Sequence, residues 1–390
     1  MIVALSAPVL IVLSCGAIDL ASVNADRSAF QDAADATALS AARQLGVATN
    51  NGIIARAEDF ADQQLGDLVH KDSVTVATAV ANDNGSVTVT ITGRRSSFFG
   101  NLLPPGGWAM TARATAATLG QLPLCVLSSG SGSDVQLDNT SQMTAGACLV
   151  QSNGNIAVDG SASLSAGLAQ AAGTASGPIS PSPQAGAPTI SDPFASMSIH
   201  PPLLGLCNLL DLVYTVGVNV LTPGTHCGNI TVRNGATVML LPGEHYFTHG
   251  QLQMRDNSTL TGSDVVMVFD NTSQFSFQDS SVVTLAGRRN GAYAGFVIAT
   301  TRDNTNTFQI SSTSARQLEG TIYIPSATLQ VTGTANNVAD QSAWTVVVAQ
   351  AIHMTGSPRL TINANYAGSQ VPVPSGVGDH YSSGKVALAR

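Results

Sequence analysis

The sequence is poor in charged and aromatic side chains. Charged residues make up 10% of its 390 residues and aromatic residues 5%, with 16 basic residues against 24 acidic ones. Lys and Arg form no cluster and the formal charge is −8, so a phosphate backbone would be repelled and nucleic acid is not expected as a partner. Apolar residues make up 44%, which is enough for a sizeable core and excludes a disordered chain.

Cysteine is also scarce, and its five copies form no C-x-x-C pair of the kind found in zinc or redox sites. Cys15 lies in an apolar run at the amino end, and the other four lie outside that run. Four such cysteines predict two disulfides, and hence an oxidising compartment such as a periplasm or a cell surface. Gly, Ser, Thr, Asn and Ala are abundant instead, which predicts a mainly β protein with many tight turns.

The amino-terminal residues predict one continuous helix. Residues 2–18 are apolar on every side and span roughly 25 Å, near the lower limit for a membrane-spanning helix. The helical pattern then continues with a single apolar stripe, formed by Phe30, Ala34, Ala38, Ala41 and Leu45. We therefore expect a transmembrane anchor at residues 1–25, whose helix continues into a protein domain.

Two alternatives to this anchor are a cleaved secretory signal and lipoprotein processing at Cys15. No basic segment precedes the apolar run, and Ala17-Ile18-Asp19 is a poor cleavage site. A helix that continues past the bilayer has a use only while it stays attached, so the uncleaved anchor is favoured. Asp19 is expected to reach the membrane interface, because burying an unpaired carboxylate there is unfavourable.

Residues 19–120 predict a small α+β unit. A second helical pattern covers residues 53–69. The period then changes to two on both sides of residues 82–85 (Asn-Asp-Asn-Gly), which is typical of a β-hairpin, and residues 108–116 supply a third strand. A long helix packed on a small antiparallel sheet is the general plan of a pilin-like subunit.

From residue 135 onward a pattern recurs in which apolar residues occupy positions one, three and nine, with a turn residue at position five. Its full copies are Val135/Leu137/Met143, Ile156/Val158/Leu164, Ile230/Val232/Val238, Leu252/Met254/Leu260, Phe275/Phe277/Val283 and Ile352/Met354/Leu360, with partial copies at Phe308 and Leu329. Copies that begin at 230, 252 and 275 lie 22 and 23 residues apart, which matches one coil of a parallel β-helix. We therefore expect a parallel β-helix-like solenoid at residues 121–370. The alternative is an antiparallel sandwich of hairpins.

The cysteines outside the apolar run fit this stacking. Cys125 and Cys148 lie 23 residues apart, and Cys207 and Cys227 lie 20 apart, both close to one coil. The two cysteines of each pair would therefore lie next to each other on neighbouring coils, close enough to form a disulfide.

Two segments depart from the repeat. Residues 166–206 form a Pro/Ser/Ala-rich insertion, which is expected to be a surface excursion because its prolines cannot pair in a central strand. Residues 371–390 are expected to form a flexible tail.

Enzymes that act on polysaccharides also use β-helices, so such an enzyme is an alternative function. The repeat places Asp256 and Asp279 in register, with Arg233 and Arg255 nearby, but the turn position of the two carboxylates favours a corner-forming role. Residues 244–249 hold two histidines four apart, a spacing that forms no metal pair on an extended strand. No catalytic, metal-binding or cofactor-binding residue is therefore predicted.

Several segments of the chain carry a family resemblance. Ala17-Ile-Asp-Leu20 followed by residues 30–42, with signature positions Asp19, Gln31, Ala34, Asp35 and Leu39, resembles the amino-terminal signature of TadE/TadG-like proteins of tight-adherence (Tad/Flp) pilus systems. Segments similar to longer TadG-type members are Leu124-Cys-Val-Leu, Ile190-Ser-Asp-Pro-Phe, Leu241-Pro-Gly-Glu-His-Tyr and Leu318-Glu-Gly-Thr-Ile-Tyr-Ile-Pro325. The metal-binding Asp-x-Ser-x-Ser motif of some tip-like relatives is not among them.

This resemblance implies a non-enzymatic component of pilus assembly, a minor or tip subunit acting in adhesion. It also implies a single-pass protein of the inner membrane with its bulk in the periplasm or at the cell surface. Its implied partners are the inner membrane and other pilus subunits or assembly proteins, with a surface or glycan as a further candidate. The alternatives are an envelope or secreted β-helix enzyme acting on polysaccharide and a carbohydrate- or surface-binding solenoid.

Overall fold

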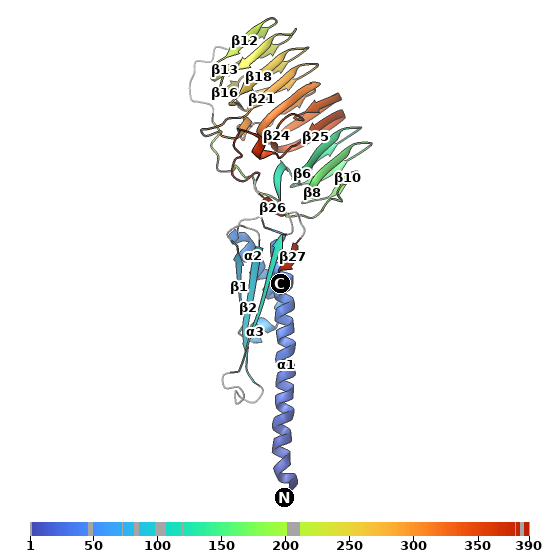
Figure 1. The fold of residues 1–390 in the computed structure, drawn as a ribbon, viewed down its shortest axis with the longest axis vertical. Coiled ribbons are helices and arrows are strands. Elements are labelled where there is room, and N and C mark those ends of the chain that lie inside the picture. Colours follow the sequence, from blue (N-terminus) through green and yellow to red (C-terminus); the bar gives the residue numbers. More distant parts are fainter. Residues whose placement is uncertain are drawn as a thin grey trace. The chain divides into compact units, whose positions relative to one another are not determined.

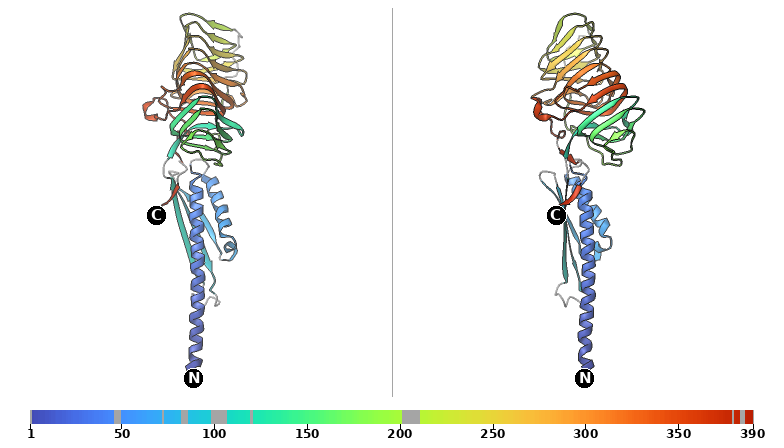
Figure 2. Two further views of the ribbon diagram at one scale, coloured as in Figure 1. Left: turned by 90° about the vertical axis from the view of Figure 1, so that its right-hand side faces the viewer. Right: turned by 45° about the vertical axis from the view of Figure 1, so that its right-hand side comes forward.

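The computed structural model of the chain contains two compact units, and each is described by itself (Figures 1 and 2). The first comprises Met1–Gln121 and Ser382–Arg390, and the second comprises Leu122–Tyr381. The structure describes residues 2–45, 50–71, 73–81, 86–97, 107–118, 121–200, 211–378, 380–382 and 386–389. For residues 2–15 it describes the backbone alone.

The first unit begins with the long helix α1, Ile2–Ala42, so the prediction of one continuous helix is confirmed. The predicted apolar stripe is buried, with Phe30, Ala34, Ala38, Ala41 and Leu45 each at most 1% exposed. Two further helices follow, α2 (Asn50–Leu65) and the short α3 (Leu68–Lys71). Helix α2 buries residues at helical spacing, and among them Ile53, Ala57 and Leu65 belong to the same core.

In the part of the chain that the structure describes in full, no helix is long and apolar enough to cross a membrane. The predicted anchor at residues 1–25 falls largely on residues 1–15, whose side chains lie outside the described set. Directly beyond them, Ile18 and Leu20 are exposed on α1, whereas Asp19 between them is buried. The transmembrane span therefore stays a prediction.

Helix α1 packs on a four-stranded antiparallel sheet of order β1-β2-β3-β27. Its strands are β1 (Thr75–Val80), β2 (Ser86–Arg95), β3 (Trp108–Thr118) and β27 (Val386–Ala389). The antiparallel pairing of β1 with β2 confirms the predicted hairpin, although residues 82–85 lie outside the described set. Side chains alternate along β2, so that Val87, Val89 and Ile91 are fully buried in the core shared with α1.

Parts of the expected flexible tail, residues 371–390, contact the rest of the chain. Val371 and Val377 are buried, at 4% and 1% exposure. Strand β27 pairs antiparallel with β3 and covers an edge that would otherwise leave backbone groups without partners. Backbone pairing of this kind depends little on side chains, so a weakly patterned sequence does not reveal it.

The second unit is a β-solenoid, as predicted, whose coils stack through three parallel sheets. In stacking order, sheet I contains β11 (Leu212–Tyr214), β14 (Ile230–Val232), β17 (Gln251–Met254), β20 (Gln274–Phe277), β23 (Thr307–Ile310), β24 (Ser314–Val338), β25 (Thr345–Thr361), β5 (Ser133–Leu137), β7 (Asn155–Val158) and β9 (Ala175–Ser176). Sheet II contains β12 (Val218–Leu221), β15 (Thr237–Leu240), β18 (Thr259–Ser263), β21 (Val282–Ala286), β24, β25, β6 (Gln142–Ser152), β8 (Ser163–Ala171) and β10 (Ile179–Ser180). Sheet III contains β13 (Gly224–Cys227), β16 (Gly243–Thr248), β19 (Val265–Phe269), β22 (Phe296–Thr300), β24, β25, β4 (Gln121–Ser128), β6 and β8. The short elements η1 (Tyr366–Gly368) and β26 (His380–Ser382) follow the last coil.

The apolar positions of the repeat form ladders inside the solenoid. Ile230 pairs with Leu252 and Leu252 with Phe275 in sheet I, and the rings of Phe275 and Phe277 stack with centroids 4.3 Å apart. All residues of the full and partial copies are at most 2% exposed. Burying each such side chain contributes roughly 1.5–3 kcal/mol, so the ladders are the main stabilising feature of this unit. The sandwich alternative is wrong, because the named sheet pairings are parallel.

The turn position of the repeat also behaves as predicted. Asn139, Gly160, Asn234, Asp256 and Asp279 have φ between +52° and +69°, the left-handed region that Gly, Asn and Asp adopt most readily. This corner redirects each coil from sheet I to sheet II, and its recurrence explains why the repeat is readable in the sequence.

The coils do not stack in the order of the sequence. Strand β25 pairs with β24 on one side and with β4, β5 and β6, from the start of the unit, on the other (Figure 1). Val347 lies beside Val126 in sheet III, and Ile352 lies beside Val135 in sheet I. One coil is therefore composite, with β25 supplying its part of sheets I and II and β4 supplying sheet III.

The expected insertion at residues 166–206 begins later than predicted. Strand β8 pairs with β6 through Ala171, the two-residue strands β9 and β10 follow, and Gln184 forms a bridge with Gln170. Residues 166–184 therefore complete the solenoid at the end nearest β10. Proline is tolerated there because the backbone groups along one edge of a terminal strand do not pair with another strand, so the missing N–H breaks no hydrogen bond.

After this end coil the chain crosses to the opposite end of the stack, where β11 begins. Asn153 holds the start of this crossing, since its side chain donates to the carbonyl of Ile190 and accepts from the N–H of Ile190, both at 2.8 Å. We call residues 185–200 the crossover segment. Residues 201–210 lie outside the described set.

A disulfide links Cys125 on β4 to Cys148 on β6, with their Cα atoms 5.6 Å apart. It ties the composite coil to the next coil of the stack. Cys227 is also disulfide-bonded, while its expected partner Cys207 and the side chain of Cys15 lie outside the described residues.

Candidate functional site

The carboxylates considered as a catalytic pair lie on neighbouring coils, as the repeat predicts. Oδ2 of Asp256 accepts the backbone N–H of Asn234 at 3.1 Å, and Oδ2 of Asp279 accepts the backbone N–H of Asp256 at the same distance. Each carboxylate thus ties its own corner to the corner of the preceding coil. This hydrogen bonding gives both residues a structural role at the corners.

Two histidines meet in the solenoid, but they are not the two that lie four apart in the sequence. Nδ1 of buried His245 on β16 lies 3.0 Å from Nε2 of His226 on the neighbouring strand β13. Nε2 of His245 donates to the carbonyl of Leu241 at 2.8 Å, which leaves Nδ1 to accept from His226. His249 lies at a corner with φ of +56°. Among the described residues, no group of three His, Cys, Asp or Glu side chains is placed to hold a metal ion.

Burial sets the charge of this histidine pair. Desolvation, together with the ring of His245, lowers the pKa of His226 to about 4, and desolvation also lowers the pKa of His245. Both rings are therefore neutral at pH 7, and the unprotonated Nδ1 of His245 can accept the hydrogen bond from His226.

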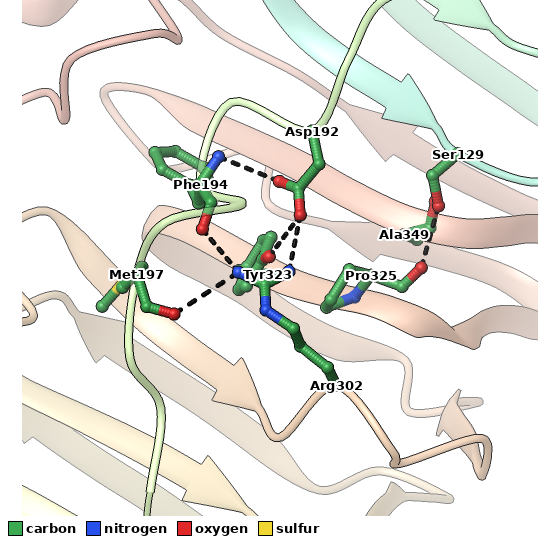
Figure 3. Close-up of polar contacts among 8 residues, drawn as sticks. All are labelled: Ser129, Asp192, Phe194, Met197, Arg302, Tyr323, Pro325 and Ala349. Carbon is green, nitrogen blue, oxygen red and sulfur yellow. Dashed lines mark hydrogen bonds and ion pairs between the residues drawn. The ribbon is translucent and has the colours of Figure 1, made fainter.

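The crossover segment is fastened by four residues that the sequence did not indicate as a site (Figure 3). Asp192 accepts hydrogen bonds from the hydroxyl of Tyr323 and from the guanidinium of Arg302, each at 2.7 Å. Arg302 also donates to the carbonyl of Phe194 and lies 5.6 Å from the centre of the Tyr323 ring. The ring of Phe194 meets that of Tyr323 edge-on at 5.2 Å. We call Asp192, Phe194, Arg302 and Tyr323 the crossover clasp.

The clasp had a partial signal in the sequence. Asp192 and Phe194 come from one segment that resembles TadG-type members, and Tyr323 comes from another. Burial and the neighbouring Asp192 raise the pKa of Tyr323, so its hydroxyl stays protonated and can donate. Two segments far apart in the sequence are thereby joined on sheet III.

Two hollows adjoin the turn that contains Asn271. One, of about 540 Å³, lies between residues 197–200 of the crossover segment and residues 301–303, and includes Asp270. The other, of about 340 Å³, has no charged side chain in its lining. We call it the amide hollow, and its lining side chains are Asn229, Gln251, Asn271, Thr272, Gln274 and Asn306.

The signature residues of the family resemblance fasten α1 to the sheet of the first unit. Ala34 is fully buried, and the half-buried Leu39 packs on the same core. Nε2 of Gln31 donates to Asp35 at 2.8 Å and to the backbone carbonyl of Arg113 on β3 at 3.3 Å. Asp19 is 7% exposed and interacts within the protein. Its expected position at a membrane interface stays a prediction.

Enlarging Ala34 is predicted to destabilise the first unit. Ala34→Leu adds a branched side chain to a closed helix–sheet contact, and such overpacking typically costs about 1–3 kcal/mol. The free energy of opening can be measured by hydrogen exchange at the amides of β2 and β3. Asp32→Leu is the matched control because Asp32 is exposed on α1, and an equal loss in both variants would contradict this packing.

The histidine pair predicts a loss of solenoid stability in mild acid. Because the pKa of His226 is about 4 in the folded state and about 6.5 when unfolded, the unfolded chain binds more protons between these values. Stability contributed by this residue is therefore present above pH 6.5 and falls by about 2 kcal/mol between pH 7 and 5.

Urea unfolding followed by circular dichroism at both pH values measures this loss. In His226→Gln the difference between pH 7 and 5 should shrink by that amount. His353→Gln changes a histidine on the outward face of β25 and serves as the control. An unchanged pH dependence in His226→Gln would show that His226 does not titrate as its burial implies.

Comparison with known protein families matches residues 1–44 to the model of TadE/G-like Flp pilus-assembly proteins (Tad). No curated protein and no solved structure matches the chain. The matched segment contains α1 and all five signature positions, while the solenoid lies beyond it. At its amino end the chain thus matches the TadE/G-like Flp pilus-assembly family, which confirms the amino-terminal part of the resemblance. The likeness of the later segments to longer TadG-type members stays a prediction.

Proposed function

We propose that this chain is a non-enzymatic, membrane-anchored component of Tad pilus assembly, and that it acts as a minor or tip subunit in adhesion. The observation that carries this proposal is the TadE/G-like domain at residues 1–44. Its helix continues into a small helix-and-sheet unit, and the same chain then builds a solenoid. A subunit of this kind would join other pilus subunits or assembly proteins through the first unit and present the solenoid as a separate surface.

The proposed location is the inner membrane, with a single span near the amino end and the bulk of the chain in the periplasm or at the cell surface. The apolar character of residues 2–18 supports an anchor there. The disulfide between Cys125 and Cys148 supports an oxidising compartment for the solenoid, because cytosolic thiols are kept reduced.

A polysaccharide-cleaving solenoid is the less favoured function. Such chemistry needs two carboxylates free to exchange protons or to attack a sugar carbon. Asp256 and Asp279 instead accept backbone hydrogen bonds at positive-φ corners. This arrangement supports a binding or structural role for the solenoid.

Shearing surface filaments from cells tests the proposed function. We expect the chain to fractionate with the filaments in small amounts relative to the major subunit, and filament number to fall when its gene is deleted. An unrelated inner-membrane protein should remain with the cells and serves as the control. The proposal fails if the chain stays entirely in the inner membrane and filaments form normally without it.

A further inference from the structure

The amide hollow follows the corner between sheets III and I across four successive coils. Asn229, Gln251, Gln274 and Asn306 lie in or directly before β14, β17, β20 and β23, which are consecutive strands of sheet I. At about 4.8 Å between neighbouring strands, these positions extend over roughly 14 Å of the stack. The hollow therefore has the length to hold a chain-like ligand.

Hydrogen bonds to two carboxylates fix part of this lining in place. Oδ1 of Asp211 accepts from both the backbone N–H and the side-chain amide of Asn229, each at 3.0 Å. Oδ1 of Asp270 accepts from the backbone N–H of Thr272 at 2.9 Å and from its hydroxyl at 2.7 Å. A lining held in this way loses little conformational freedom when a ligand binds.

Other lining side chains keep their hydrogen-bonding groups open. Among the described residues, none forms a hydrogen bond with the side-chain amides of Gln251, Gln274 or Asn271. Gln251 and Gln274 are paired in register on β17 and β20. Because each amide offers two donors and a carbonyl acceptor, the pair forms a repeated donor and acceptor array one strand apart.

From this geometry we infer that the amide hollow binds a neutral oligosaccharide chain. Sugar hydroxyls both donate and accept, and therefore match amide side chains at successive coils. An acidic glycan or a nucleic acid would be repelled by the carboxylates of Asp211 and Asp270 beside the hollow and by the net charge of −8 of the chain. The lining holds no cationic side chain that could bind such a ligand. A protein partner would need an apolar centre, which this lining does not provide. The inference deepens the proposed function and rests on it for an outward-facing solenoid.

The test uses the purified full-length chain and an array of neutral and acidic oligosaccharides, followed by calorimetric titration of the bound glycans. We expect binding to neutral glycans, and at least a tenfold weaker affinity in the double variant Gln251→Ala/Gln274→Ala. Gln330→Ala is the matched control, because it removes a glutamine from the outward face of sheet I on β24, two strands beyond β20 and outside the lining of the hollow. Equal thermal midpoints for all three proteins establish that any loss of binding is not a loss of fold.

The inference is overturned if no neutral glycan on the array binds, if acidic glycans bind more tightly, or if the double variant and the control behave alike. These outcomes are separate from those of filament shearing. Glycan binding by a chain that is absent from filaments would sink the pilus proposal and leave the glycan site standing. Filament association without glycan binding would support the pilus proposal and contradict the glycan site.

Discussion

The parallel pairing of β25 with β4 is the contact on which the solenoid depends. In an ordinary solenoid the two ends of the chain lie in terminal coils, which contact only one neighbour. Here β25, the last strand of the coils in sequence, and β4, the first, build one coil together in the interior of the stack. Separating them would expose apolar ladders on both sides, including Val126 and Val347. The disulfide of Cys125 ties β4 to the following coil at this same place.

Local features of the chain were predictable because each follows from a few neighbouring residues. The interior position of Phe275, the left-handed corner at Asp256 and the buried stripe through Ala34 could all be predicted from spacing and residue type. The stacking order could not be predicted, because the strand edges of all coils are similar. Nothing in the local sequence therefore specifies which coil pairs with which. The pairing of His226 with His245 was missed for the same reason, since it depends on the register between coils.

The two units divide the proposed function between them. The first contains the segment that matches TadE/G-like proteins, and in it the helix α1 is held on a sheet by small and polar residues such as Ala34 and Gln31. The second has an outer surface rich in uncharged polar side chains over an apolar interior. The charged side chains of the crossover clasp and of the corners are engaged in contacts within the protein. The groups that we propose to bind a ligand are therefore uncharged amides such as those of Gln251 and Gln274.

Native-state hydrogen exchange at β4 tests the composite coil most directly. Strand β4 begins the unit in sequence, but it pairs with β25 on one side and β6 on the other. Its amides, such as those of Val126 and Leu127, should therefore exchange as slowly as those of β25, because both open only when the stack opens. Exchange at β4 as fast as at the terminal strand β11 would contradict the composite coil.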